Sequence, residues 1–228
     1  MEKLVLFDID GTLVLTGGAG LLALNRVVAG ELGASRGLEG IPVAGRTDRA
    51  IIADVLARHD RHDLLGDDVL ERFCGDYFRY LEEELARDLP GKRVLPGVGP
   101  LLETLAARPD VELALLTGNF EEGARLKLAH FGLWRYFPWG AFGGDTVDRN
   151  ALFPVALARA RERGLAPRPE DVFVIGDTPH DVACARSGGA RAIAVATGPF
   201  PVEALAATGA DLVLPDLSDP RPVLDLIS

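Results

Sequence analysis

The chain closes its first apolar run, Leu4–Asp8, with Phe7-Asp8-Ile9-Asp10-Gly11-Thr12-Leu13. Asp8 and Asp10 are two residues apart, so both side chains can point to the same side where a strand ends. Gly11 allows the backbone to turn sharply there. Two carboxylates at close range repel each other, and a divalent cation with a preference for oxygen ligands, such as Mg²⁺, would relieve that repulsion. Such a pair also occurs in loops and helix caps, so its meaning depends on the rest of the chain.

Further short runs of Val, Ile, Leu and Ala alternate with helical patterns along the chain. Continuous apolar runs are typical of strands that are buried on both faces, and their alternation with helices predicts a parallel sheet of the α/β class. The expected strands are Glu112–Thr117, Val172–Asp177 and Arg191–Ala196, with two shorter ones at Ala141–Phe142 and Asp211–Leu214. The expected helices are Gly97–Ala107, Phe120–Phe131, Asn150–Gly164, Asp181–Ser187 and Pro201–Thr208.

One stretch interrupts this alternation. Between the first strand and Val94 we predict no strand, but three amphipathic helices, at Gly20–Leu32, Asp48–Arg58 and Asp67–Asp88. The apolar residues that share one face are Leu21, Leu24, Val28 and Leu32 in the first helix and Val69, Leu70, Phe73, Tyr77 and Leu81 in the third. Turn-forming residues flank this stretch, in Leu15–Gly18 and Leu89–Lys92. We therefore expect a Rossmann-like α/β core formed by residues 1–15 and 93–228, with an all-helical cap, residues 16–92, inserted after the first strand.

Composition limits the classes of function. The 228 residues carry a formal net charge of −10, which disfavours binding to a phosphate backbone by bulk electrostatics. The two cysteines, Cys74 and Cys184, are too few for a disulfide framework and lack metal-ligand spacing. No apolar run approaches the length of a membrane span, and the N-terminus does not read as a signal peptide. We expect a cytoplasmic protein, monomer or homodimer, that binds neither nucleic acid nor membrane.

Two other predicted strands end in residues that can carry chemistry. Val172–Asp177 ends in the carboxylate of Asp177, and Asp181 follows four residues later. Glu112–Thr117 ends in the hydroxyl of Thr117, and the backbone N–H groups after it can bind an anion where the next helix begins. In open parallel sheets, ligands bind outside the carboxyl ends of the strands. Three strand ends are therefore expected to place several carboxylates and a hydroxyl in one site.

These residues, in this order, resemble three motifs of the haloacid dehalogenase superfamily. Asp8-Ile9-Asp10-Gly11-Thr12 is similar to motif I, Thr117 to motif II, and Gly176-Asp177 with Asp181 to motif IV. The helical insertion resembles the C1-type cap of the branch that is similar to phosphoglycolate phosphatases. The resemblance spans nearly the whole chain. It implies a phosphatase that acts on a small phosphorylated metabolite, with phosphoglycolate-like compounds as the first class to consider.

The resemblance also implies roles for the two acids of motif I. Asp8 resembles the nucleophile that attacks phosphorus and becomes a phospho-aspartate. Asp10 resembles the general acid and base, which protonates the leaving oxygen and then activates water. Its presence favours phosphate-ester chemistry over the dehalogenase and phosphonatase branches, which tend to lack an acid at this position.

Further roles concern the metal ion and the phosphoryl group. The resemblance implies that Mg²⁺ is held by the Asp8 carboxylate, the Asp10 backbone carbonyl and Asp177, with Asp181 as an outer or occasional direct ligand. It implies that Thr117 and the N–H groups of the next residues, Gly118 and Asn119, bind the phosphoryl oxygens.

The sequence departs from the family at motif III, which usually supplies a lysine about 25 residues before motif IV. This region offers Arg149, which could bridge Asp8 and the phosphate. Lys127 is the alternative cation, and from its place on the helix after Thr117 we expect it to face the site less directly. In the insertion, Arg46 in Gly45-Arg46-Thr47-Asp48 resembles the substrate-specificity loop of C1 caps and could meet an anionic leaving group.

Two alternatives remain open from the sequence. A phosphomutase that acts on sugar phosphates, similar to beta-phosphoglucomutase, shares motif I and a helical cap, and it differs in keeping water away from the phosphoenzyme. A phospho-accepting switch of the receiver type also combines acids, a threonine and a cation on a parallel sheet. Receiver domains are about half this length and have no inserted helical lid.

Overall fold

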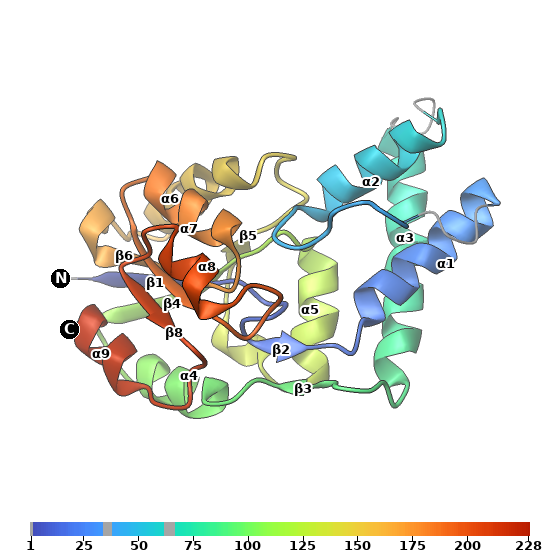
Figure 1. Cartoon of the computed structure of the whole chain (residues 1–228). Helices are drawn as coiled ribbons and strands as arrows, with labels where there is room; N and C mark the ends of the chain where they lie inside the picture. The colour runs from blue at the N-terminus through green and yellow to red at the C-terminus, as the bar shows by residue number, and fades with distance from the viewer. Residues whose placement is uncertain (1, 34–37, 62–66) are drawn as a thin grey trace.

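The computed structural model describes residues 2–33, 38–61 and 67–228, the last range without the side chains of residues 67–72. A parallel sheet of six strands forms its centre, in the order β5-β4-β1-β6-β7-β8 (Figure 1). The strands are β1 (Lys3–Phe7), β4 (Val111–Leu116), β5 (Gly140–Ala141), β6 (Val172–Gly176), β7 (Arg191–Val195) and β8 (Leu212–Leu214). The predicted α/β class and the Rossmann-like sheet are confirmed, as are all six expected strands to within two residues.

Helices cover both faces of the sheet because successive strand residues point to opposite sides. In β1, Val5 and Phe7 belong to one apolar cluster and Leu4 and Leu6 to the other. The first cluster includes residues of α4 (Val98–Ala106), α5 (Glu121–His130) and α9 (Arg221–Ile227). The second includes residues of α6 (Leu152–Glu162), α7 (Pro179–Ser187) and α8 (Val202–Ala206). The sequence analysis did not include α9, whose seven residues are too few to show a clear helical period.

Three helices between β1 and β4 form a unit of their own, called here the helical segment: α1 (Ala19–Leu32), α2 (Asp48–Arg58) and α3 (Asp67–Ala86). They lie beside one end of the sheet (Figure 1). Their buried apolar residues form a separate cluster, which includes Val28, Val55 and Leu81. The expected helices are therefore present, and each begins or ends within two residues of its predicted bounds.

Two details of the insertion differ from expectation. β2 (Val14–Leu15) pairs antiparallel with β3 (Arg93–Val94), although no strand was predicted before Val94. A two-residue strand shows no period, so its sequence carries no signal. Leu21, predicted to face inward from the first helix of the insertion, is 43% exposed. Val69 and Leu70, predicted on the inner face of the third helix, lie outside the residues whose side chains are described.

The two-stranded ribbon of β2 and β3 links the helical segment to the sheet at both of its ends. Leu95 N–H also donates to the Leu13 carbonyl at 3.0 Å, which extends the pairing into the core. None of the described helices is both long and apolar enough to span a bilayer.

Candidate active site

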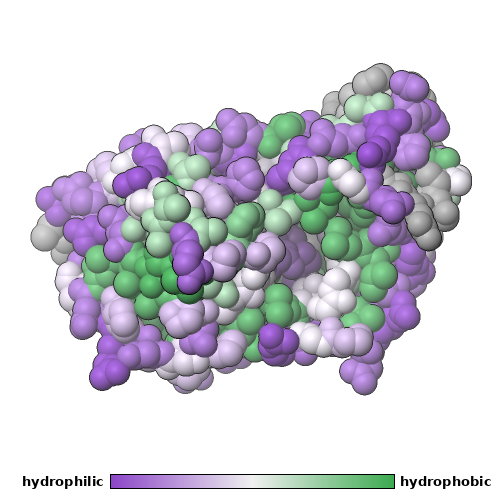
Figure 2. All heavy atoms as spheres, viewed as in Figure 1, coloured by the Kyte–Doolittle hydropathy of each residue, from purple (hydrophilic) through white to green (hydrophobic). Residues whose placement is uncertain are grey.

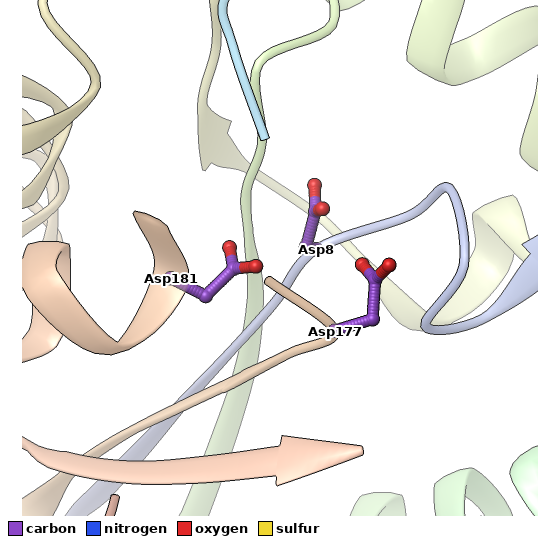
Figure 3. Close-up of side chains that lie close together, drawn as sticks. All are labelled: Asp8, Asp177 and Asp181. Carbon is purple, nitrogen blue, oxygen red and sulfur yellow. The ribbon is translucent and has the colours of Figure 1, made fainter. Parts of the chain in front are cut away.

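Three carboxylates meet at the carboxyl end of the sheet. Asp8 follows β1, Asp177 follows β6, and Asp181 lies in the first turn of α7, and their oxygens lie within 4.8 Å of one another. The strands β1 and β6 are hydrogen-bonded neighbours, and so their ends bring Asp8 and Asp177 together. Figure 3 shows the side chains of Asp8 and Asp177 side by side, with Asp181 reaching toward them from its helix. The three residues are 5%, 2% and 2% exposed, respectively.

Burial makes this cluster electrostatically unfavourable. Loss of hydration, together with the charges of Asp181 and Asp8, raises the pKa of Asp177 to about 9. The pKa of Asp8 is raised to about 6, again chiefly by burial, although Arg149 and a hydrogen bond from Thr117 act in the opposite direction. A cation bound between the carboxylates would offset these costs, and carboxylate oxygens are ligands that Mg²⁺ prefers.

The turn after β1 has a shape that leaves room for Asp177. Gly11 has φ of 79°, and a Cβ at this residue would lie 2.4 Å from Asp177 Oδ2. Both the left-handed backbone and the close approach require glycine. Thr12 donates from its hydroxyl to Asp177 Oδ1 at 3.3 Å, which helps to hold this carboxylate in place.

The end of β4 places a polar network beside Asp10. Thr117 is fully buried, and its hydroxyl oxygen accepts hydrogen bonds from the Asn119 side-chain amide at 2.9 Å and the Asn119 backbone N–H at 3.3 Å. The same side-chain amide donates to Asp10 Oδ2 at 2.9 Å. The structure thus brings Thr117, Asn119 and Asp10 together as the sequence predicted.

Arg149 lies against the carboxylate cluster. It begins the 3₁₀ turn η3 (Arg149–Ala151), is 7% exposed, and places its Nη2 3.3 Å from Asp8 Oδ2. The same nitrogen forms an ion pair with Asp181. Burial on its own would lower the pKa of Arg149, but the charges of Asp181 and Asp8 raise it above its usual value, so the side chain stays cationic. Its buried Nε has no hydrogen-bond partner among the described residues.

Lys127 is also part of the site, and the expectation that it faces the site less directly is wrong. Its Nζ lies 2.6 Å from Asp10 Oδ2 and 2.6 Å from Asn119 Oδ1, and the residue is 4% exposed. Long side chains on a helix lean toward its N-terminus, and the N-terminus of α5 points at the site. Lys127 therefore reaches the site although it lies in the second half of the helix. The two cations lie beside different acids, Arg149 beside Asp8 and Lys127 beside Asp10.

The helical segment contacts the site through the start of α2. Asp48 N–H donates to the Gly118 carbonyl at 2.7 Å, and the Asp48 carboxylate accepts from Phe120 N–H at 2.9 Å. Thr47 donates from its hydroxyl to the Val147 carbonyl at 2.9 Å. Burial raises the pKa of Asp48 to about 6, although Lys127 and the Phe120 N–H favour its charged form. The sequence analysis quoted Asp48 but gave it no role, because its partners belong to a distant part of the chain.

Arg46 lies in the loop just before α2 and lines the pocket, but its charge is already paired with an acid. Its Nη1 is 2.5 Å from Asp54 Oδ2 and 3.2 Å from the Pro42 carbonyl oxygen. The sequence analysis expected Arg46 to meet an anionic leaving group. In the structure its charge is paired with Asp54, an exposed residue of α2.

A pocket of about 530 Å³ lies between the end of the sheet and the helical segment. Asp8, Asp10, Asp177 and both cations line it on the side of the sheet. Of the predicted site residues, Thr117 and Asp181 are not part of its lining. Thr117 contacts Asp8 and Asn119 from beneath, and Asp181 caps α7 by accepting hydrogen bonds from the Thr178 N–H and hydroxyl at 2.9 and 2.7 Å.

The chain is similar to known proteins in both sequence and fold. The family described as haloacid dehalogenase-like hydrolase matches residues 5–186. Phosphoglycolate phosphatase 1 of Pseudomonas aeruginosa is 30% identical over 99% of this chain and 80% of its own length. A phosphoglycolate phosphatase of Rhodospirillum rubrum is 32% identical over 96% of this chain and 89% of its own length. The beta-phosphoglucomutase structure of Clostridium difficile has the same fold, with a TM-score of 0.72 at 15% identity over 100% of this chain and 97% of that chain.

Proposed function

Since the chain belongs to the haloacid dehalogenase-like hydrolases and is an enzyme of their phosphatase branch, we propose that it hydrolyses a small phosphorylated metabolite through a phospho-aspartate at Asp8, with Mg²⁺ as cofactor. The observation that carries this proposal is the position of the Asp8 carboxylate. It lines the pocket between the acidic cluster and Arg149, with Asp10 nearby. Phosphoglycolate is the reference compound, because the named relatives are phosphoglycolate phosphatases.

The two-part organisation is included in this proposal. Residues 1–15 and 93–228 would be the core, and residues 16–92 the cap that covers its site. The separate apolar cluster of the helical segment and the ribbon of β2 and β3 support this division. So do the hydrogen bonds between Asp48 and the residues at the end of β4. The receiver-like switch, which the sequence left open as an alternative, is not supported by the family to which the chain belongs.

The donor set fits a hard divalent cation. Three buried carboxylates lie within 4.8 Å of one another, and burial raises the pKa of Asp177 to about 9 in the absence of an ion. The carboxylates of Asp8 and Asp177 and the backbone carbonyl of Asp10 would hold Mg²⁺, with Asp181 next to them. Bound there, Mg²⁺ would neutralise charge on the phosphoryl oxygens during transfer.

In the first step, an Asp8 oxygen attacks phosphorus, and the bond between phosphorus and the leaving oxygen breaks. Asp10 donates its proton to that oxygen, so the product leaves as a neutral alcohol. Asn119 and Lys127 hold the Asp10 carboxylate through hydrogen bonds of 2.9 and 2.6 Å. Arg149, next to Asp8, would contact the phosphoryl oxygens and favour their charge as it develops.

In the second step, water attacks the phosphorus of the phospho-aspartate, and Asp10 takes the proton of that water. The bond between phosphorus and the Asp8 oxygen breaks, which restores the carboxylate and releases inorganic phosphate. Gly118 and Asn119, which line the pocket, would contact the phosphoryl group during both steps. Thr117, which the resemblance assigned to the phosphoryl oxygens, does not line the pocket and would instead hold Asp8 and Asn119 in place.

The proposal is tested by incubating the pure protein with a panel of phosphorylated metabolites, with and without Mg²⁺, and measuring released phosphate. We expect release only with the metal. Absence of release from every compound, p-nitrophenyl phosphate included, would contradict a phosphatase.

A sugar phosphomutase is the second candidate, because the fold matches a beta-phosphoglucomutase. Adding a sugar bisphosphate activator and a hexose 1-phosphate separates the two activities. A phosphomutase would yield the isomerised sugar phosphate, whereas the phosphatase proposed here yields free phosphate.

A further inference from the structure

The wall of the pocket on the side of the helical segment is largely apolar. Leu21 and Leu24 of α1, Ile51 of α2 and Val43 line it, together with Tyr77 of α3. Figure 2 shows apolar residues around the hollow between the sheet and the helical segment. Leu21 is 43% exposed, so much of its apolar side chain is open to the solvent. Such a side chain gains stability when an apolar ligand covers it.

Each cation of the pocket already has a carboxylate partner. Among the described lining residues, the cations are Arg46, Lys127 and Arg149. Their partners are Asp54 for Arg46, Asp10 for Lys127, and Asp8 and Asp181 for Arg149. The only one of the three on the helical segment is Arg46, which Asp54 holds at 2.5 Å. Among the described lining residues, a carboxylate on the leaving group would thus meet a positive charge on that side only by competing with Asp54 for Arg46.

A carboxylate would also meet an acid. Asp48 lines the pocket on the side of the helical segment, and its oxygen accepts from Phe120 N–H. Burying an anion beside a like charge and apolar side chains costs free energy, and the cation described on that wall, Arg46, is already paired with Asp54.

The volume of the pocket also favours a leaving group larger than glycolate. A pocket of about 530 Å³ lies within the range of pockets that hold ligands much larger than a two-carbon acid.

We propose that the leaving group of the natural substrate is uncharged and carries an apolar portion that lies against Leu21, Leu24 and Ile51. This inference rests on the proposed phosphatase function and names the substrate class of the same site. It distinguishes this enzyme from its relatives that are phosphoglycolate phosphatases, because glycolate is a carboxylate with no apolar portion to bury.

The first test compares kcat/KM for three alkyl monophosphates in the presence of Mg²⁺: phosphoglycolate, 2-hydroxyethyl phosphate and n-butyl phosphate. We expect 2-hydroxyethyl phosphate to exceed phosphoglycolate by about tenfold, and butyl phosphate to exceed it further, since apolar contacts in a pocket give factors of about 10–200 per group. A preference for phosphoglycolate would overturn the inference. So would hydrolysis of p-nitrophenyl phosphate with none of the three alkyl esters. Failure with all four esters would instead contradict the phosphatase function.

A matched pair of leucines tests the apolar contact. Leu21 and its neighbour Leu22 are 43% and 39% exposed, but Leu22 does not line the pocket. Leu21→Ser should lower kcat/KM for butyl phosphate by about tenfold and that for 2-hydroxyethyl phosphate much less. Leu22→Ser should change neither. Equal effects of the two substitutions would contradict the proposed contact, and because both side chains are exposed, neither variant is expected to unfold.

A gain of activity tests the role of the ion pair. Asp54→Asn removes the charge that holds Arg46 and should raise kcat/KM for phosphoglycolate by about fivefold or more relative to butyl phosphate. Asp76→Asn removes a comparable exposed ion pair with Arg79 in the middle of α3, and because neither residue lines the pocket it is the matched control. If the ratio of the two substrates is unchanged in Asp54→Asn, pairing of Arg46 does not set the preference and the inference fails.

Discussion

The two walls of the pocket differ in how their polar groups are held. On the sheet side, acids and cations bind one another: Lys127 holds Asp10 and Asn119, and Arg149 holds Asp8 and Asp181. On the side of the helical segment, the described lining is mostly apolar, and its cation, Arg46, is paired with the exposed Asp54.

This difference indicates that the two walls have different roles, one in bond breaking and the other in the choice of leaving group. A preorganised polar wall can stabilise charge without rearranging, which suits bond breaking. An apolar wall discriminates by shape and by the absence of charge, which suits the choice of a leaving group. Substitutions on the sheet side should therefore slow every ester, and those on the other side should change the preference among esters.

The largest effect is expected at the centre of the sheet wall. Asp8→Asn should lower kcat by more than about 10⁴-fold for every ester, because an amide is a poor nucleophile. Released phosphate measures the rate, and an unchanged circular dichroism spectrum shows that the variant folds. Turnover near that of the wild type would refute the role of Asp8.

The acidic cluster gives the next prediction. Asp177→Asn should raise the Mg²⁺ concentration needed for half-maximal activity by at least about 100-fold. Without metal, the same variant should be no less stable than the wild type, because it removes one of three buried, mutually repelling carboxylates. Thermal unfolding with and without Mg²⁺ measures this, and an identical metal-induced shift in both proteins would count against a ligand at this residue.

The two cations on the sheet wall are expected to act on different atoms. Arg149→Ala should slow hydrolysis of all esters by at least about tenfold, or about 1.4 kcal/mol. Lys127→Met should slow butyl phosphate by a similar factor and p-nitrophenyl phosphate much less, since nitrophenolate leaves without a proton from Asp10. Equal losses for both esters in both variants would remove the distinction between them.

The smallest effect concerns the contact between the walls. The pKa of Asp48 is raised to about 6 from 3.8, so the folded protein binds this proton more tightly than the unfolded chain does. The free energy of unfolding of the wild type should therefore fall, relative to Asp48→Asn, as the pH rises from about 4 to about 7. We expect a relative change of about 1 kcal/mol, less than the full pKa shift would give, because Asp48 is partly exposed and solvent screens its charge. Denaturant titrations at a series of pH values measure it, and a constant difference would contradict the burial of Asp48.

The sheet wall could be predicted from the sequence because its residues lie at fixed places in regular elements. A strand that ends at Asp8 or Asp177 delivers its carboxylate to the same edge whatever the rest of the chain does. Thr117 and Asn119 follow β4 in the same way. The contacts of Lys127 could not be predicted in this way, because the reach of its side chain depends on the direction in which α5 points.

The other wall could not be predicted, because its contacts depend on how two separately packed units meet. Periodicity placed Leu21 with the inner residues of its helix, and no local signal showed that it faces a pocket. Likewise, pairing of Arg46 with Asp54 depends on the path of a loop, and the partners of Asp48 lie some 70 residues further along the chain.

The central claim is that Asp8 is transiently phosphorylated, and chemical trapping tests it most directly. The enzyme is mixed with substrate and Mg²⁺, quenched within one turnover, and treated with borohydride, which reduces an acyl phosphate to an alcohol. Peptide mass spectrometry should then find homoserine in place of aspartate at residue 8 and at no other acidic residue. Unmodified Asp8 in an enzyme that turns over, or reduction at another carboxylate, would contradict the account.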